Sequence, residues 1–180
     1  MEEFLQAGKQ TQITSRIKEI TDAIVGVDYE FILKLLKWIN KNIRYPAPEG
    51  VEKNDVFRLR TADQIVKDGF ATGCTDFALV FIAVARAKGV PTRYVEAIAK
   101  DYFSDDPDKV RGHIFAECYI NGDWWGVDPM AGNLKAGIKY PGYVVYGRGL
   151  DSWDMGIRDI KTMREKFRQF ANEYTEGRQR

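Results

Sequence analysis

Hydrophobic residues in the first third of the chain recur at helical spacing. Near the N-terminus they fall every three or four positions, at Ile13, Ile17, Ile20 and Ile24. The run 28–42 (DYEFILKLLKWINKN) then places four apolar side chains on one face, at Phe31, Leu35, Trp38 and Ile39. Asp28 is the predicted N-cap of this second helix, and Pro46 lies beyond its end. Both helices are expected to pack on the core.

Turn and capping residues punctuate the next segment. Residues 45–56 (YPAPEGVEKNDV) contain two prolines, a glycine and mixed charge, which predicts a surface loop. Thr61 and Gln64 have the spacing of a capping box. The short helix that this box begins is expected to end near Gly69.

The stretch 71–91 (ATGCTDFALVFIAVARAKGVP) is apolar over most of a helical circumference. The helix is expected to begin at or just after Cys74 and to stop at Gly89, because glycine suits the left-handed position that follows a helix. A helix that is apolar on nearly all sides is buried, so this one is predicted to be the central helix.

After this helix the hydrophobic period shortens. Three short runs rich in β-branched and aromatic residues predict strands at 92–99 (TRYVEAIA), 113–120 (HIFAECYI) and 123–128 (DWWGVD). Asn121 and Gly122 predict a two-residue hairpin turn, which makes the second and third strands antiparallel neighbours. A further strand is expected at 142–147 (GYVVYG), and a C-terminal helix at 152–174 is expected to turn several apolar residues inward, namely Ile157, Ile160, Met163, Phe167 and Phe170.

These elements predict an α+β fold, in which the central helix packs on an antiparallel sheet with flanking N- and C-terminal helices. The 180 residues are long enough for one core and indicate a single domain. Within it we expect a helical N-terminal extension (1–60), a catalytic core (61–147) and a C-terminal helix (148–180).

Composition excludes several classes of function. The net charge is +1, which provides no general attraction to nucleic acid or to anionic membranes. The sequence contains neither a leader-like start nor an apolar run long enough to span a bilayer, so a cytoplasmic protein is expected. The two cysteines, Cys74 and Cys118, are expected to be free thiols. The acidic loop 101–109 (DYFSDDPDK) is expected to be solvated.

Cys74 and His113 carry the first candidate chemistry. A cysteine at a helix N-terminus faces backbone N–H groups that have no partner within the helix, and the helix dipole there favours a thiolate. The dipole alone is a small effect, so a second cation is required. His113 is the single histidine of the chain and starts a predicted strand. It is therefore the candidate base for a cysteine nucleophile.

The hairpin register supplies a third residue. A turn at Asn121-Gly122 pairs Ile120 with Asp123, and the same register sets Phe115 opposite Asp128. Because His113 and Phe115 share a strand face, the carboxylate of Asp128 is expected to lie diagonally within reach of the imidazole. A nucleophile, a base and a carboxylate that orients the base form the logic of a triad.

Each of these residues also has a purely structural interpretation. A lone cysteine before an apolar helix is more often a core residue, a lone histidine is usually structural, and an aspartate before proline is usually a turn former. Cys118 lies five residues after His113, so strand alternation turns it to the opposite face, where we expect it to pack in the core. A zinc site is disfavoured because the chain has few suitable ligands, and no metal or cofactor is expected.

Three stretches together resemble the transglutaminase-like superfamily, a group with a papain-like arrangement of the cysteine nucleophile. They are TGCTDFALVFIAVARAKGVPTRYV, GHIFAECYI and DWWGVDP, and the resemblance runs over about Thr61 to Pro129. It implies Cys74 as nucleophile, His113 as base and Asp128 as the orienting acid. Phe115 stands where the family often has tryptophan, which removes no reacting group.

The expected activity is a cysteine-dependent hydrolysis of an amide bond in a peptide or protein, by a peptidase, isopeptidase or deamidase reaction through an acyl-enzyme. An acyltransferase that uses an amine acceptor is the first alternative, and a non-catalytic binding module of the same fold is the second. The oxyanion is expected to bind the backbone N–H of Cys74 and one upstream side chain. Tyr45 is preferred to Trp38 as that donor, because Trp38 fits an apolar helical face.

Overall fold

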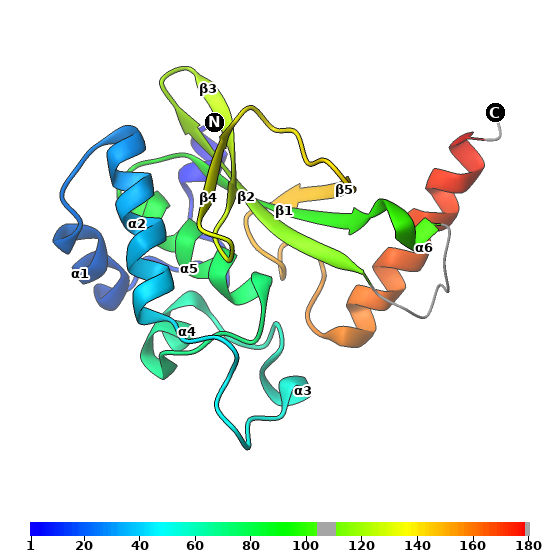
Figure 1. The fold of residues 1–180 in the computed structure, drawn as a ribbon, viewed down its shortest axis with the longest axis horizontal. Helices are drawn as coiled ribbons and strands as arrows, with labels where there is room; N and C mark the ends of the chain where they lie inside the picture. The colour runs from blue at the N-terminus through cyan, green and yellow to red at the C-terminus, as the bar shows by residue number, and fades with distance from the viewer. Residues whose placement is uncertain (104–110, 179–180) are drawn as a thin grey trace.

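The computed structural model describes residues 1–103 and 111–178. Over these residues the chain forms an α+β fold with one antiparallel sheet (Figure 1). The helices are α1 (Ser15–Ala23), α2 (Asp28–Asn42), α3 (Lys53–Val56), α4 (Ala62–Asp68), α5 (Cys74–Ala87) and α6 (Ile160–Arg178), with short 3₁₀ turns η1 (Glu2–Leu5) and η2 (Lys100–Phe103). The strands are β1 (Thr92–Ala99), β2 (Gly112–Ile120), β3 (Asp123–Asp128), β4 (Asn133–Ala136) and β5 (Tyr143–Gly149).

Helix α5 lies at the centre of the helical layer. Every residue from Thr75 to Arg86 is buried, which confirms the expectation drawn from its apolar circumference. It packs against α1, α2 and α4 on one side and against β1 and β2 on the other (Figure 1). Gly89 follows the helix with φ of 85°, as predicted for a residue that ends a helix in the left-handed conformation.

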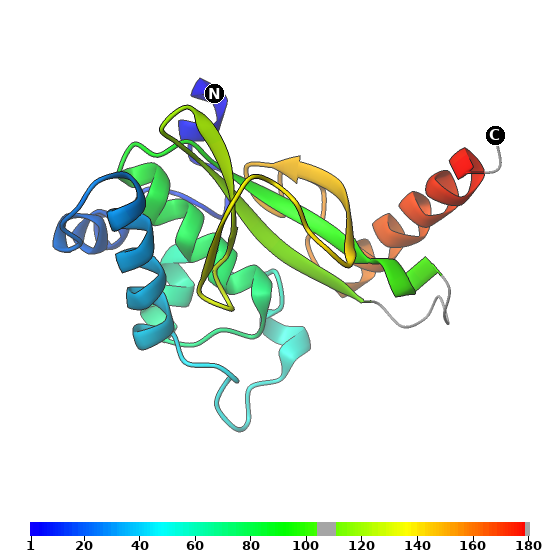
Figure 2. The same cartoon turned by 45° about the horizontal axis from the view of Figure 1, so that its top comes forward.

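The sheet has the order β4-β3-β2-β1-β5, and all four pairings are antiparallel. Alternate residues of β2 divide between its two faces, because side chains along a strand point in opposite directions. Ile114, Ala116 and Cys118 pack with α5 in the main core. Phe115 instead packs with Val95, Tyr140 and other residues on the opposite face. The connection from β4 to β5 crosses the sheet on that second face (Figure 2).

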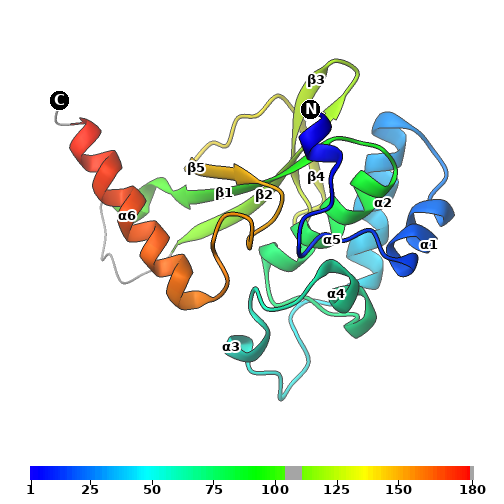
Figure 3. The ribbon, with the colours of Figure 1, turned by 180° about the vertical axis from the view of Figure 1, so that it is seen from behind.

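Helix α6 packs at the end of the sheet away from α1 and α2 (Figure 3). Its Phe167 is buried against Ile98 and Tyr102. Ile98 points to the same face of β1 as Tyr94, which belongs to the core around α5. The large helices therefore cover one face of the sheet, as the sequence predicts.

Local capping and turn signals located most boundaries. Thr61 and Gln64 form a reciprocal capping box, and Gly69 ends α4 with φ of 72°. The hairpin at Asn121-Gly122 pairs Ile120 with Asp123 as predicted, and both turn residues have positive φ.

Three expectations were wrong. Asp28 is the first residue of α2 with φ of 47°, and Val27 holds the cap position without a side-chain hydrogen bond. The surface loop predicted over 45–56 ends in the short helix α3. The C-terminal helix starts at Ile160 and not near residue 152, because residues 151–156 form a turn in which Gly156 has φ of 74°.

The sequence did not predict strand β4, and most of the predicted acidic loop lies outside the described residues. Strand β4 was missed because it has only four residues, and none of them is buried. The acidic segment 101–109 lies mostly outside the described residues, although its Tyr102 is buried. Among the helices in residues 1–103 and 111–178, none is both long and apolar enough to cross a membrane.

Candidate active site

Cys74 is the first residue of α5 and is half-buried. The turn before it is held by Asp76, whose carboxylate is buried and accepts hydrogen bonds from the backbone N–H and the hydroxyl of Thr72, at 2.7 and 2.9 Å. Arg60 donates to the same carboxylate at 2.6 Å. Asp76 and Arg60 therefore fix the backbone that presents the Cys74 thiol, and the sequence reasoning had assigned a role to neither.

His113 lies near the start of β2, and its Nε2 is 2.8 Å from Oδ2 of Asp128 at the end of β3. The other carboxylate oxygen of Asp128 accepts the backbone N–H of Ala131 at 3.1 Å, which fixes the carboxylate. Backbone pairing between the two strands runs from Ile120 to Ala116, in the register that sets Asp128 across from the next residue of β2. The predicted diagonal contact between base and carboxylate is present.

The electrostatics of this pair favour a charged imidazole. Burial by itself would lower the pKa of His113, but hydrogen bonds to Asp128 and Cys74, together with their charges, raise it from 6.5 to about 10. Burial opposes the charged form of Asp128 too, yet the hydrogen bond and charge of His113 hold the pKa of that carboxyl below its usual value. The side chains of His113 and Asp128 are 19% and 20% exposed, so solvent reaches both.

The three side chains thus lie together: His113 contacts Asp128, and Cys74 is close enough for its hydrogen bonding and charge to contribute to the raised pKa of His113. Cys118 lies outside this group. That thiol is fully buried in the core on the opposite face of β2, and burial raises its pKa to about 12. The geometry separates the two cysteines in the way that strand alternation predicts, while the catalytic role of the three grouped residues stays a prediction.

The two candidate oxyanion donors differ in position. The Tyr45 ring packs edge-on against Phe77, which lies one turn after Cys74 on α5. Trp38 lines a groove with α1 and with lysines of its own helix, away from the residues that surround Cys74. Tyr45 is 51% exposed at the thiol end of α5 and remains the better candidate.

Two pockets flank this group of three residues. One, of about 150 Å³, lies on the thiol side and is lined by Cys74, Gly112 and the buried pair Arg58 and Glu96. The other, of about 230 Å³, adjoins His113 and Asp128 on the opposite face of the sheet. In the described part of the chain, no group of three or more histidine, cysteine, aspartate or glutamate side chains is arranged to hold a metal ion.

The titration of His113 tests the electrostatics directly. Because this is the only histidine of the chain, the imidazole resonances of tag-free protein in an NMR spectrum belong to one residue. We expect the imidazolium to persist through neutral pH and to deprotonate only as the pH rises through about 10. Asp128→Asn is expected to lower the titration midpoint, because it removes the negative partner. A midpoint near 6.5 in the unmodified protein would contradict this picture.

Comparisons with known proteins bear on the family of the chain. A family model for the transglutaminase-like superfamily matches residues 14–129, a segment that includes α1 and α2 as well as the motifs around Cys74, His113 and Asp128. No curated protein matches the chain by sequence.

Two solved structures are similar to parts of this chain. A candidate cysteine protease from Cytophaga hutchinsonii superposes with a TM-score of 0.63 and 22% identity, over 86% of this chain and 48% of its own. A candidate protease from Parabacteroides distasonis has a TM-score of 0.47 and 12% identity, over 70% of this chain and 24% of its own. The chain spans about half the length of the first neighbour. At this identity, the likeness to the Cytophaga protein is one of fold.

Proposed function

This chain belongs to the transglutaminase-like superfamily, and we propose that it is a cysteine-dependent amide-bond hydrolase of the peptidase, isopeptidase or deamidase type. Its substrate is a peptide or protein. The single observation that carries the proposal is the grouping of the three side chains, in which His113 contacts Asp128 and lies close to Cys74 at the N-terminus of the central helix. A structural cysteine requires no such partners.

The first half of the reaction uses the charged pair. The Cys74 thiolate attacks the amide carbonyl carbon, a C–S bond forms, and the resulting oxyanion accepts the backbone N–H of Cys74. Protonated His113 transfers its proton to the amide nitrogen as the C–N bond breaks, so the amine leaves neutral. Asp128 stabilises the imidazolium and fixes its orientation.

The second half uses the imidazole as a base. Neutral His113 takes a proton from water, the hydroxide attacks the thioester, and Cys74 leaves as thiolate. The exposed fifth of both His113 and Asp128 supports water as the acceptor, because solvent reaches the base that must activate it. Tyr45 is the proposed second donor to the oxyanion.

The two free thiols also bear on location. Cys74 is half-buried and Cys118 is buried, and neither takes part in a disulfide. Free thiols of this kind persist in a reducing compartment. We therefore propose the cytoplasm as the place of action.

Product analysis tests the proposed reaction. Pools of peptides and glutaminyl amides would be incubated with the protein in water labelled with heavy oxygen, with and without methylamine, and read by mass spectrometry. We expect a new carboxyl group that carries one heavy oxygen atom, and little methylamide, because water resolves the acyl-enzyme. A dominant methylamide product would favour the acyltransferase, and the absence of any Cys74-dependent product would contradict an enzymatic function.

A further inference from the structure

The larger of the two pockets beside the site is lined by aromatic and basic residues. It adjoins His113 and Asp128, and its aromatic lining consists of Phe115, Tyr140 and Tyr143. The rings of Phe115 and Tyr140 stack, with their centroids 4.3 Å apart and their planes at 30° to each other. Tyr143 meets Phe115 edge-on at 5.3 Å. This surface is large enough for one amino-acid side chain.

Contacts within the protein hold the segment between β4 and β5 that lines the pocket. The backbone N–H of Gly126 donates to the carbonyl of Gly137 at 3.0 Å, and the Tyr140 hydroxyl donates to buried Glu117 at 2.8 Å. A Cβ atom added at Gly126 would lie 3.1 Å from the Gly137 carbonyl oxygen, which is tighter than an ordinary contact, so glycine favours this close approach. The connection from β4 to β5 is therefore fixed against β3, and the pocket is preformed.

The charges around this pocket are unbalanced. Lys135 and Lys139 both line it, and neither forms an ion pair with any residue in the described parts of the chain. The carboxylates beside the pocket already have partners. Asp128 bonds His113, and Glu117 bonds Tyr140 and two arginines, Arg93 and Arg148. Two ammonium groups thus face the pocket without a negative partner among the described residues.

We propose that this pocket binds a carboxylate-bearing side chain on the leaving-group side of the scissile amide, which makes acidic peptides the preferred substrate class. The assignment of the leaving-group side rests on the proposed hydrolase function. The leaving amine must lie beside the imidazole that protonates it, and this pocket adjoins that imidazole. The aromatic side chains contact the aliphatic part of a glutamate side chain, and the two lysines bind its carboxylate.

Binding tests the proposal without any turnover. Tag-free Cys74→Ser protein would be titrated with N-acetylglutamate methylamide and with N-acetylglutamine methylamide, and the His113 imidazole resonance would report occupancy. We expect the glutamate compound to bind more tightly by on the order of tenfold, with a difference that shrinks as salt is added. The double variant Lys135→Gln/Lys139→Gln should remove the preference. The matched variant Lys37→Gln/Lys41→Gln, on the exposed side of α2, should keep it.

Turnover then separates this proposal from the proposed function. Peptide pools that carry glutamate or glutamine directly after the scissile bond should differ in kcat/KM by on the order of tenfold, and the difference should vanish in Lys135→Gln/Lys139→Gln. Pools that differ in the residue before the scissile bond should have equal kcat/KM. If the glutamate and glutamine peptides are cleaved with equal kcat/KM and both probes bind equally, the proposed acidic preference is wrong and the proposed hydrolase function is retained. If the glutamate probe binds preferentially but nothing is cleaved, the hydrolase is wrong and the carboxylate pocket stands.

Discussion

Replacement of Cys74 by alanine is expected to lower kcat by a factor on the order of 10⁶, the size seen when an acyl-enzyme hydrolase loses its nucleophile. Without the sulfur atom no acyl-enzyme forms, and His113 and Asp128 have no group to activate. The thiol is half-buried at the start of α5, so the fold should survive its loss. The measurement is single-turnover kinetics on a substrate from the product screen, with the free energy of unfolding measured in urea as a check.

The second cysteine supplies the control for this prediction. Cys118→Ala should leave kcat close to its original value, because that thiol is buried on the far face of β2. In the unmodified protein at about pH 6, iodoacetamide should label Cys74 and spare Cys118, and His113→Ala should slow the labelling at least tenfold by removing the cation beside the thiol. Equal labelling of both cysteines would favour the non-catalytic binding module. Turnover that survives Cys74→Ala would instead contradict the assignment of Cys74 as the nucleophile.

Local sequence patterns were sufficient to predict the positions of Cys74, His113 and Asp128. A two-residue turn at Asn121-Gly122 sets the register of the whole hairpin, and the period of two decides which face each side chain takes. The contact between His113 and Asp128 therefore followed from counting outward from the turn. The start of α5 at Cys74 followed in the same way from the apolar run behind it.

Other parts of the site depend on contacts between distant segments, which a local pattern does not encode. Asp76 is visible in the sequence as an acidic residue in the first turn of a helix, a place where it is common. Its pairing with Arg60 depends on how the preceding loop folds back. Arg58 gives still less warning, because an arginine in a charged loop is normally solvated. In the folded chain it is 2% exposed.

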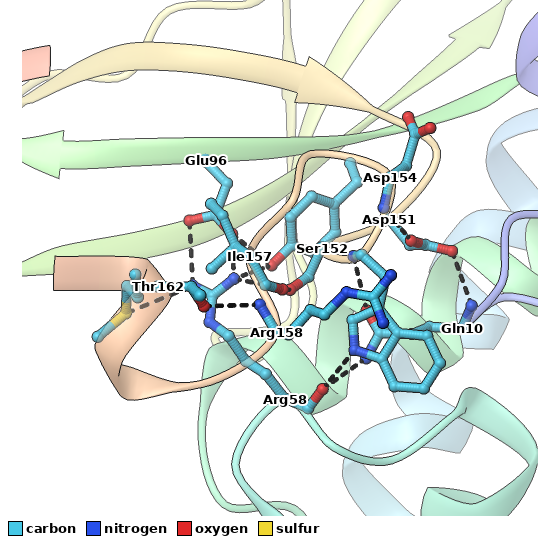
Figure 4. A network of polar contacts seen from close by, with 12 residues as sticks. Gln10, Arg58, Glu96, Asp151, Ser152, Asp154, Ile157, Arg158 and Thr162 are labelled. Atoms are coloured by element: carbon cyan, nitrogen blue, oxygen red, sulfur yellow. Dashed lines mark hydrogen bonds and ion pairs between the residues drawn. The ribbon is translucent and has the colours of Figure 1, made fainter. Parts of the chain in front are cut away.

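Arg58 is the centre of a buried polar network beside the pocket on the thiol side (Figure 4). Its guanidinium pairs with the carboxylate of Glu96 on β1, which is fully buried, and also donates to the hydroxyls of Tyr94 and Ser152, at 3.2 and 3.0 Å. The hydroxyls of Tyr94 and Tyr146 donate to Glu96, at 2.9 and 3.0 Å. The network ties the loop before α4, the sheet and the turn before α6 together.

The charges of Arg58 and Glu96 depend on each other. Burial opposes the charged form of Arg58, but the adjacent carboxylate of Glu96 raises the pKa of the guanidinium above its ordinary value. Burial raises the pKa of both neighbouring tyrosines, Tyr94 and Tyr146, so they remain neutral donors to the carboxylate. Removal of Glu96 would leave a buried cation without a counter-charge, the costly case for an ion pair inside a protein.

Glu96→Ala is therefore expected to lower the free energy of unfolding by about 3–5 kcal/mol, measured by urea denaturation. A domain is typically stable by only about 5–15 kcal/mol, so this loss is a large share of the stability. The double variant Arg58→Met/Glu96→Leu should recover part of the loss, because no uncompensated charge remains, although the hydroxyls of Tyr94 and Tyr146 lose their acceptor. Glu30→Gln, which breaks the exposed pair with Lys34 on α2, should change stability by less than about 0.5 kcal/mol. If Glu96→Ala lowered the free energy of unfolding as little as Glu30→Gln, then water would be solvating Arg58 or another acid would be neutralising it. The contact between the loop before α4 and the sheet would then not depend on this ion pair.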